Sequence, residues 1–392
     1  MRIAISGAGV AGPALAYWLH RAGHEPTLVE RAPHFRTGGY IIDFWGVGYR
    51  VAEKMGIDAA VRDAGYQVTS LRSVGADGRV QAEVRTDAIR RAAGDKYTSL
   101  PRGDLAAAIY STIENSVETI FSDTITAVHD HSDGVRLEFE HGPAREFDLL
   151  VGADGLHSTV RELTFGPENQ FERYLGAQVA ACVVDGYRPR DELIYVTHNL
   201  PGRQVARFSL RDNRTLFLFV FRADRHDECG DAAASRARLR HEFGDAGWEC
   251  PQILDALDDA DDLYVDVVSQ IRMDRWSRGR VALIGDAAAC VSLLAGEGTG
   301  LAMTEAYVLA GELTRAGGDH RRAFDAYEKR LRRFIEGKQD GAQKFLSFFA
   351  TRTPMGIRVR NLAMRAMNVP ILADVVLNRS LHDDLELPDY AM

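Results

Sequence analysis

The sequence predicts an α/β fold that combines a doubly wound parallel sheet, an antiparallel sheet and a helical C-terminal region. Three observations lead to this prediction. The first forty residues follow a strand–turn–helix–strand pattern, which is typical of the opening of a parallel sheet. Between about residues 170 and 270, short strand patterns follow one another closely, which indicates antiparallel pairing. From about residue 319 onward the pattern is mostly helical.

The N-terminal unit consists of two short buried strands on either side of a helix. Residues 3–5 form the first apolar strand pattern, and residues 26–30 form the second. Between them, a glycine-rich turn over residues 7–12 leads into a helix over 14–21 with an apolar face. This order predicts the first unit of a parallel sheet that is covered by helices.

The middle of the chain predicts a mixture of strands and helices. The expected elements are a hairpin over 69–84 that turns at Ala76-Asp77-Gly78, a helix over 103–115, strands over 119–128, 135–139, 147–151, 193–197, 204–210, 215–221 and 281–284, and a helix over 302–313. Two of these strands end in turns that carry an acidic residue. The strand over 147–151 runs into Gly152-Ala153-Asp154-Gly155, and the strand over 281–284 runs into Gly285-Asp286.

The domains are expected to be interleaved along the chain, because the parallel and antiparallel patterns alternate and no internal repeat or low-complexity linker separates them. We assign residues 1–68, 98–168 and 271–318 to a dinucleotide-binding domain. Residues 69–97 and 169–270 form a substrate domain, and residues 319–392 form a C-terminal helical region.

Composition narrows the class of protein. The formal net charge is −9, which argues against a nucleic-acid-binding protein because such proteins usually carry a basic surplus. The four cysteines are widely spaced and form no pair of the kind that binds zinc. No apolar run approaches the roughly 18 residues of a membrane span. We therefore expect a soluble cytoplasmic protein, monomeric or a weak homo-oligomer, without a metal, a nucleic-acid partner or a membrane partner.

The turn Gly7-Ala8-Gly9-Val10-Ala11-Gly12 lies between a strand and a helix, the context in which a GxGxxG pattern indicates a dinucleotide site. Gly7 permits the tight turn, Gly9 lets a pyrophosphate approach the backbone, and Gly12 lets the helix pack on the strand. Phosphate oxygens would meet the N-terminal end of the helix. Glu30 ends the second strand, where a carboxylate can bind ribose hydroxyls. The turn by itself does not distinguish FAD from NAD.

The acidic turns at Asp154 and Asp286 favour a flavin, because a simple NAD dehydrogenase does not need them. An aspartate at such a turn can accept hydrogen bonds from the ribityl hydroxyls of a flavin. The helix that follows would direct its N-terminal dipole at the isoalloxazine ring, which is negatively charged when it is reduced. The sequence thus predicts a Rossmann-like FAD-binding fold with an interleaved antiparallel-sheet substrate domain and C-terminal helices.

At these residues the chain resembles the class A FAD-dependent monooxygenases, the group of para-hydroxybenzoate hydroxylase, aromatic polyketide hydroxylases and tetracycline-inactivating monooxygenases. The resemblance covers nearly the whole chain and rests on three motifs: residues 7–12 with Glu30, residues 152–161, and residues 285–288 leading into Gly296-Glu297-Gly298-Thr299-Gly300. It implies non-covalent FAD, with NADPH or NADH as a transient reductant. It also implies hydroxylation of an aromatic or polyketide-like small molecule by O2 through a flavin C4a-hydroperoxide.

The resemblance also implies which residues contact the cofactors. Glu30 would bind the adenosine ribose, Arg102 would contact FAD, and Asp286 would bind the ribityl and phosphate region. Asp154 belongs to a motif linked to both FAD and NADPH, while Arg36 and Asp43 match positions that contact NADPH and FAD. The complete set of expected cofactor-binding residues is Gly7, Ala8, Gly9, Ala11, Gly12, Glu30, Arg31, Arg36, Asp43, Arg102, Asp154, Gly285, Asp286, Gly298 and Thr299. No catalytic base is nominated.

The chain departs from the family pattern at three positions near the reactive edge of the flavin. Ala289 replaces the usual histidine, Leu293 the usual proline and Gly300 a frequent asparagine. Two alternatives therefore stay open: a flavin-dependent reductase or dehydrogenase of the same fold, and a non-catalytic flavin-fold binding protein.

Three aromatic residues also have two interpretations. Phe217, Phe219 and Phe221 alternate along one strand, and they are expected either to cover the substrate site or to form one face of an ordinary sheet core.

Overall fold

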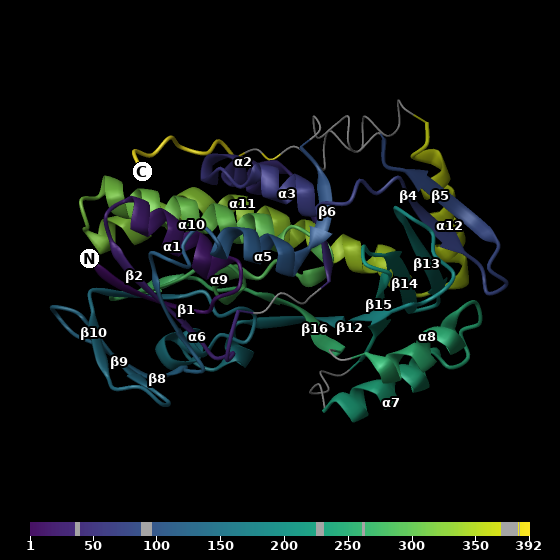
Figure 1. The fold of residues 1–392 in the computed structure, drawn as a ribbon, viewed down its shortest axis with the longest axis horizontal. Coiled ribbons are helices and arrows are strands. Elements are labelled where there is room, and N and C mark those ends of the chain that lie inside the picture. The colour runs from purple at the N-terminus through teal and green to yellow at the C-terminus, as the bar shows by residue number, and fades with distance from the viewer. Residues whose placement is uncertain (36–39, 88–95, 225–230, 261–262, 370–382, 384) are drawn as a thin grey trace.

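The computed structural model describes residues 1–35, 40–87, 96–224, 231–260, 263–369, 383 and 385–392. Arg36, one of the expected NADPH contacts, lies outside the described residues. The structure has the predicted α/β fold, with a parallel sheet at one end of the molecule and an antiparallel sheet at the other (Figure 1).

The first sheet has six strands in the order β17-β18-β11-β1-β2-β7. Its strands are β1 (Arg2–Ser6), β2 (Glu25–Glu30), β7 (Glu118–Phe121), β11 (Leu149–Gly152), β17 (Ser277–Arg278) and β18 (Val281–Leu283). All neighbours pair in parallel except β17 and β18. The glycine turn after β1, Glu30 at the end of β2, the Asp154 turn after β11 and the Gly285-Asp286 turn after β18 therefore lie along one edge of this sheet.

Helices cover this sheet and frame its functional edge. They are α1 (Ala11–Arg21), α2 (Gly46–Met55), α3 (Asp58–Ala64), α5 (Arg102–Tyr110), α6 (Thr159–Phe165), α9 (Asp286–Ala289) and α10 (Gly298–Arg315). Helix α10 packs against both α1 and α2, and its residues from Leu301 to Leu313 are buried. The α1 helix buries its apolar face, including Leu15, Trp18 and Leu19, because it lies between the sheet and α10.

The second sheet has seven strands in the order β16-β12-β15-β14-β13-β4-β5. They are β4 (Ser70–Val74), β5 (Val80–Arg85), β12 (Glu172–Asp185), β13 (Ile194–Leu200), β14 (Arg203–Ser209), β15 (Arg214–Arg222) and β16 (Leu263–Ile271). The expected hairpin is formed by β4 and β5, and β4 joins the sheet by parallel pairing with β13. Segments far apart in the chain therefore build one sheet, with antiparallel pairing everywhere else in it.

The remaining strands of the described residues form two smaller sheets. Strands β3 (Ile41–Phe44) and β6 (Thr98–Pro101) pair antiparallel, and β8 (Ile125–Asp130), β9 (Val135–Phe139) and β10 (Arg145–Phe147) form a meander. The β3–β6 pair carries Asp43 and leads directly into α5 and Arg102, two of the expected cofactor-binding residues.

The C-terminal region is helical, with α11 (His320–Phe349) and α12 (Pro354–Ala366). Helix α11 runs along α10, and α12 lies against β5 at the far end of the second sheet (Figure 1). Helix α11 is amphipathic, and its side chains Phe324, Tyr327, Leu331 and Ile335 are all buried. The C-terminal helices thus span the distance between the two sheets.

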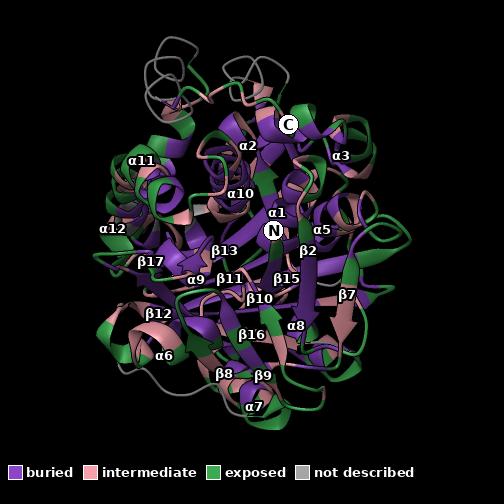
Figure 2. Ribbon diagram, turned by 90° about the vertical axis from the view of Figure 1, so that its left-hand side faces the viewer, coloured by how far each residue is buried: buried purple, intermediate pink, exposed green. Residues whose placement is uncertain are grey.

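The two faces of the seven-stranded sheet pack against different partners. One face, with Phe208 and Leu216, meets the segment around Tyr40 and Tyr66 and is called here the inner face. The other face packs against α7 (Ala232–Phe243) and α8 (Cys250–Ala256) and is called the outer face. Buried residues concentrate in the sheets and in the helix surfaces that face them, while exposed residues lie on the outside of the helices and at the turns (Figure 2).

Candidate functional site: a dinucleotide cradle beside the inner face of the second sheet

The glycine turn after β1 requires glycine at two positions. Gly7 has a φ of +102°, and a Cβ there would lie 2.5 Å from the carbonyl oxygen of Ala153. A Cβ on Gly12 would lie 1.9 Å from the carbonyl oxygen of Gly7, so α1 could not approach β1. No side chain of the described residues caps the N-terminus of α1, which leaves its first N–H groups available to a phosphate.

Glu30 is buried and holds the glycine turn against the end of β2. Its two carboxylate oxygens accept hydrogen bonds from the backbone N–H groups of Ala8 at 2.8 Å and Ala32 at 2.9 Å. Carboxylate oxygens can each accept more than one hydrogen bond, so the same group can also accept from a ribose hydroxyl. The next residue, Arg31, is exposed.

Arg102 and Asp286 lie on either side of the space in front of the glycine turn. Arg102 is the first residue of α5, and its Nη2 lies 3.5 Å from the point where a Cβ on Gly9 would be. Asp286 is the first residue of α9, and burial raises the pKa of its carboxyl while the positive charge of Arg102 opposes that rise. The absent side chain at Gly9 keeps the approach between the turn and Arg102 open.

The turn before Asp286 is packed between two helices. Gly285 has a φ of +62°, and a Cβ there would lie 3.3 Å from the Cβ of Ala11 and 3.4 Å from that of Ala302. On the other side, an Asp286 carboxylate oxygen lies 3.6 Å from the point where a Cβ on Gly298 would be. The expected residues Ala11, Gly285, Asp286 and Gly298 are therefore brought together at one place, with Thr299 in the same first turn of α10.

Asp43 occupies a separate position on the β3–β6 pair. Its carboxylate accepts hydrogen bonds from the Tyr97 hydroxyl at 2.7 Å and the Ser99 hydroxyl at 2.5 Å. The side chain is open to solvent on one side, yet the surrounding protein desolvates it and raises its pKa, against the effect of those two hydrogen bonds. Asp43 lines a small pocket together with Trp45 and Glu297.

Asp154 stabilises the start of α6. Its carboxylate accepts hydrogen bonds from the Ser158 hydroxyl at 2.5 Å and from the Val160 N–H at 3.1 Å, and Ser158 in turn accepts from the Arg161 N–H at 3.0 Å. The Asp154 Cα lies 2.9 Å from the point where a Cβ on Gly7 would be. The Asp154 loop therefore lies directly against the glycine turn, and its carboxylate serves as a helix cap.

Two tyrosines adjoin the cradle, the name used here for the glycine turn together with Glu30, Arg102 and Asp286. Tyr264 lies on the inner face and Tyr40 in the segment that packs against it, and the sequence pattern did not single out either residue. The rings of Tyr40 and Tyr264 lie 5.8 Å apart, and the Tyr264 hydroxyl donates a 2.7 Å hydrogen bond to Asp266. Burial raises the pKa of Tyr40 to about 12, with Arg102 acting against this rise and Asp286 reinforcing it. Tyr40 thus lies within electrostatic range of both cradle residues. The sequence around these two tyrosines gives no signal of this position, because Tyr40 follows two glycines and Tyr264 lies near the start of β16.

The three alternating phenylalanines do not cover the site. Phe217, Phe219 and Phe221 lie on the outer face, in one core cluster with Phe243 of α7 and Ile253 of α8. The expectation that they cover the substrate site is wrong, and the alternative of an ordinary sheet core is confirmed. The face turned toward the cradle instead carries Leu216 and Leu218, which alternate with the phenylalanines along β15.

The Gly300 departure has a structural reason, because α2 crosses α10 at this point. A Cβ on Gly48 would lie 2.4 Å from the Cα of Gly300, while a Cβ on Gly300 would lie 3.3 Å from the Cα of Gly48. The two helices approach so closely that backbone faces backbone. Ala289 is buried and Leu293 half-buried; nothing in the structure explains these two departures.

The described residues contain no group of three or more histidine, cysteine, aspartate or glutamate side chains arranged to hold a metal ion. None of the helices within them is both long enough and apolar enough to cross a bilayer.

The fold and the cradle define a dinucleotide-binding flavoprotein, and comparison with known proteins agrees. Residues 1–341 match the family described as FAD binding domain. A flavin-dependent monooxygenase from an unknown prokaryotic organism is 35% identical over 86% of this chain and 87% of its own. Another, from Legionella longbeachae, is 32% identical over 86% and 87%.

The crystal structure of the tetracycline destructase Tet(51) superposes with a TM-score of 0.84 and 31% identity, over 99% of both chains. The chain therefore belongs to the flavin-dependent monooxygenases of the FAD binding domain family.

Proposed function

We propose that the protein binds FAD non-covalently, accepts electrons from NADPH or NADH, and uses O2 to hydroxylate an aromatic or polyketide-like small molecule. The observation that carries this proposal is the position of Arg102 and Asp286. They flank the glycine turn on one side and adjoin the tyrosine-bearing inner face of the second sheet on the other. A cofactor laid along this line would reach from Glu30 to the inner face.

The described residues fit FAD along its length. The N–H groups at the start of α1 and the Arg102 guanidinium would hold the pyrophosphate, and Glu30 would accept from the adenosine ribose. Asp286 would accept from the ribityl chain. The N-terminus of α10, which has no acidic residue in its first turn, would stabilise negative charge on the reduced ring. When bound, FAD would supply the redox chemistry and the activation of O2.

The inner face would seat the substrate and exclude water from the flavin. Leu218 and Tyr264, which are only partly buried, would supply apolar contacts there. Tyr40 is protonated at neutral pH, like any tyrosine, and burial raises its pKa further, to about 12, so its hydroxyl can donate a hydrogen bond to a carbonyl or phenolic oxygen. The Asp154 loop, which lies against the glycine turn, is the segment where a transient nicotinamide cofactor would approach.

The test is a substrate screen on the purified, FAD-loaded protein. Phenols and fused-ring polyketides are added with NADPH or NADH, and oxygen uptake, hydrogen peroxide and product mass are measured together. Tetracycline belongs in the first panel, because one relative is named a tetracycline destructase. The expected result is a compound that accelerates NAD(P)H oxidation and gains one oxygen atom, with little peroxide released.

Other outcomes favour the alternatives. Acceleration with no oxygenated product, under air or under nitrogen with an added electron acceptor, would indicate a reductase or dehydrogenase. A purified protein that binds no FAD when the apoprotein is titrated would contradict the proposal at its first step.

A further inference from the structure

A second cavity lies on the outer face of the seven-stranded sheet, away from the FAD cradle. It has a volume of about 420 Å³, within the usual size range for small-molecule sites. Its lining comes from the β4–β5 hairpin, from β13 and β14, and from two loops, which carry Asp191 before β13 and Trp248 and Glu249 before α8.

The register of the strands shows on which face of the seven-stranded sheet the cavity opens. Arg72 pairs with Val196, Val196 pairs with Arg207, and Arg207 pairs with Phe217 across β4, β13, β14 and β15. Side chains at paired positions point to the same face of a sheet. Phe217 packs toward α7 and α8, so the cavity opens on the outer face and is separated from Tyr40 and Tyr264 by the sheet itself.

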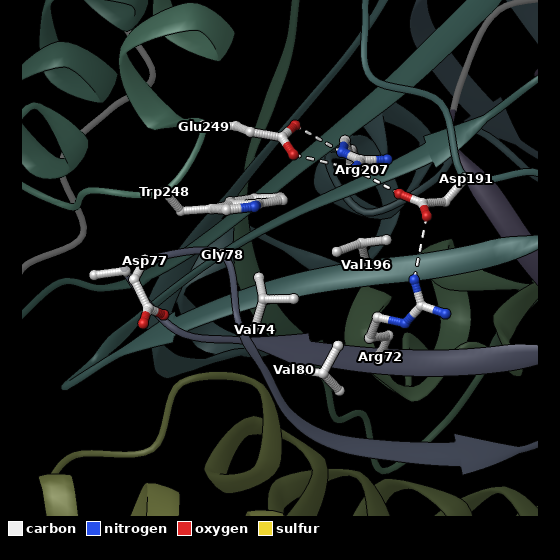
Figure 3. A pocket seen from close by; sticks show the side chains of 11 residues that line it. Arg72, Val74, Asp77, Gly78, Val80, Asp191, Val196, Arg207, Trp248 and Glu249 are labelled. Atoms are coloured by element: carbon white, nitrogen blue, oxygen red, sulfur yellow. Dashed lines mark hydrogen bonds and ion pairs between the residues drawn. The ribbon is translucent and has the colours of Figure 1, made fainter.

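Hydrogen bonds join the two walls of the cavity, the β4–β5 hairpin and the loop before α8. The backbone N–H of Trp248 donates a 2.7 Å hydrogen bond to the carbonyl oxygen of Ala76 at the hairpin tip. The His198 ring bridges the carbonyl oxygens of Val74 at 3.0 Å and Ala246 at 2.8 Å. Trp248 itself has a φ of +52°, which is costly for a bulky residue and persists only where surrounding contacts impose it. The indole ring is thereby held at the cavity wall (Figure 3).

The charged groups of the wall leave hydrogen-bond donors without acceptors. Arg207, only 3% exposed, donates to Glu249 at 2.7 Å and to Asp191 at 2.7 Å, and Arg72 donates to the other oxygen of Asp191 at 3.1 Å (Figure 3). After these pairings, Nη1 of Arg207 and Nε of Arg72 have no partner among the described residues. A buried donor without an acceptor is destabilising, so the wall favours an incoming oxygen acceptor.

The charge and the shape of the cavity lining limit the class of ligand that fits. The lining contains two arginines and three carboxylates, Asp77, Asp191 and Glu249, so it offers no positive surplus that would attract an anion. Val74, Val80 and Val196 supply apolar surface opposite the Trp248 ring. Aromatic and aliphatic walls of this kind favour a flat ring system.

We propose that this cavity is a second small-molecule site, which binds a neutral planar compound with a carbonyl acceptor. The ring lies between Trp248 and the valines, and the carbonyl oxygen accepts from Arg207 and Arg72. The site does not depend on the flavin or on the oxygenation reaction.

The test uses FAD-loaded protein and the probe 2-naphthamide, with 2-naphthoate as its anionic counterpart. Binding is measured by calorimetry while the flavin absorbance spectrum is recorded. The expected result is saturable binding of 2-naphthamide, at least tenfold tighter than that of 2-naphthoate, with an unchanged flavin spectrum. The substitution Val80→Trp fills the cavity from an exposed hairpin position and should weaken binding at least tenfold.

A matched control and a second variant keep the proposal open to contradiction. Leu163→Trp adds the same side chain at another exposed apolar position, on α6, and should leave binding unchanged. Trp248→Leu removes the ring wall and should weaken binding as Val80→Trp does. No saturable binding, binding that Val80→Trp leaves intact, tighter binding of 2-naphthoate, or a flavin spectrum that changes with occupancy would each overturn the proposal.

Discussion

The backbone N–H of Gly285 donates a 2.7 Å hydrogen bond to the buried carboxyl of Glu305, which lies one α10 turn beyond Leu301. The hydroxyl of Tyr327, on α11, lies 3.0 Å from the same carboxyl oxygen. Residues of α10 and α11 thus fix the turn that leads into Asp286, on the side away from the cradle. Glu305 is a positioning residue, because it acts on the site through the Gly285 backbone.

Replacing Glu305 with glutamine should raise the free energy of unfolding relative to that of the parent protein, and the difference should grow as the pH rises. Burial raises the pKa of Glu305 to about 8, from an ordinary value of 4.5. The folded state therefore binds this proton more tightly than the unfolded state, and stability falls as pH rises from about 4.5 through 8. Glutamine keeps an acceptor for Gly285 and does not titrate. Each pKa unit corresponds to about 1.4 kcal/mol, so the variant should gain a few kcal/mol relative to the parent between pH 5 and pH 9.

Urea unfolding of both apoproteins at pH 5, 7 and 9 measures this difference. Unfolding free energies that change in parallel across this range would mean that Glu305 ionises as freely in the folded protein as in water.

Asp286→Ala should weaken FAD binding more than Asp43→Ala does. Asp286 lies between Arg102 and the start of α10, where its hydrogen bonds to the cofactor would be shielded from water. Losing a charged partner in such a place costs about 1.5–3 kcal/mol, or roughly ten- to a hundredfold in affinity. Asp43 already accepts from Tyr97 and Ser99 and is open to solvent. Fluorescence titration of the two apoproteins with FAD compares them, and equal affinities would show that Asp286 is misassigned.

Glu30→Ala should lower FAD affinity while turnover of the fully loaded enzyme stays nearly unchanged. The carboxylate lies at the adenosine end of the cradle, so its contact with the ribose should be the same in the ground and transition states, and uniform binding does not alter the chemical barrier. The structure adds a second effect. The variant also strands the N–H groups of Ala8 and Ala32, so the apoprotein should lose about 1–3 kcal/mol of stability.

FAD titration, turnover at saturating FAD and urea unfolding separate these effects. Glu30→Gln serves as the control, because its amide oxygen can still accept one of the two backbone hydrogen bonds. A large fall in saturated turnover would place Glu30 near the reaction centre, contrary to its position at the end of β2.

Gly48→Ala should destabilise the protein more than Gly300→Ala. Alanine favours a helix over glycine by about 1 kcal/mol, so both changes would stabilise an isolated helix. At Gly48, however, the new Cβ would lie 2.4 Å from the backbone of α10 and force α2 away, and overpacking of this kind costs about 1–3 kcal/mol. At Gly300 the closest contact is 3.3 Å, which a small shift can relieve. Thermal unfolding of the two variants side by side decides; a Gly48 variant as stable as the parent would show that α2 moves freely on α10.

The sequence by itself determined the elements whose requirements are local. The strand–turn–helix at the N-terminus was predicted because Gly7 and Gly12 can be read as turn and packing glycines without knowing the rest of the fold. The order of elements also placed Glu30, Asp154 and Asp286 at the carboxyl ends of strands. Parallel strands share an edge, so their common location followed from the pattern.

Only the tertiary structure decided which distant groups meet. Alternation along β15 shows that Phe217 and Leu218 lie on opposite faces, but not which face α7 and α8 will cover, since both faces are apolar. In the same way, no local pattern links Glu305 to Gly285, or Gly48 to Gly300, because each contact depends on how α10 crosses its neighbours. The partner of a buried polar group, or of a backbone that lies close to another, comes from a segment far away in the chain. The sequence of one segment alone therefore does not show which partner it will meet.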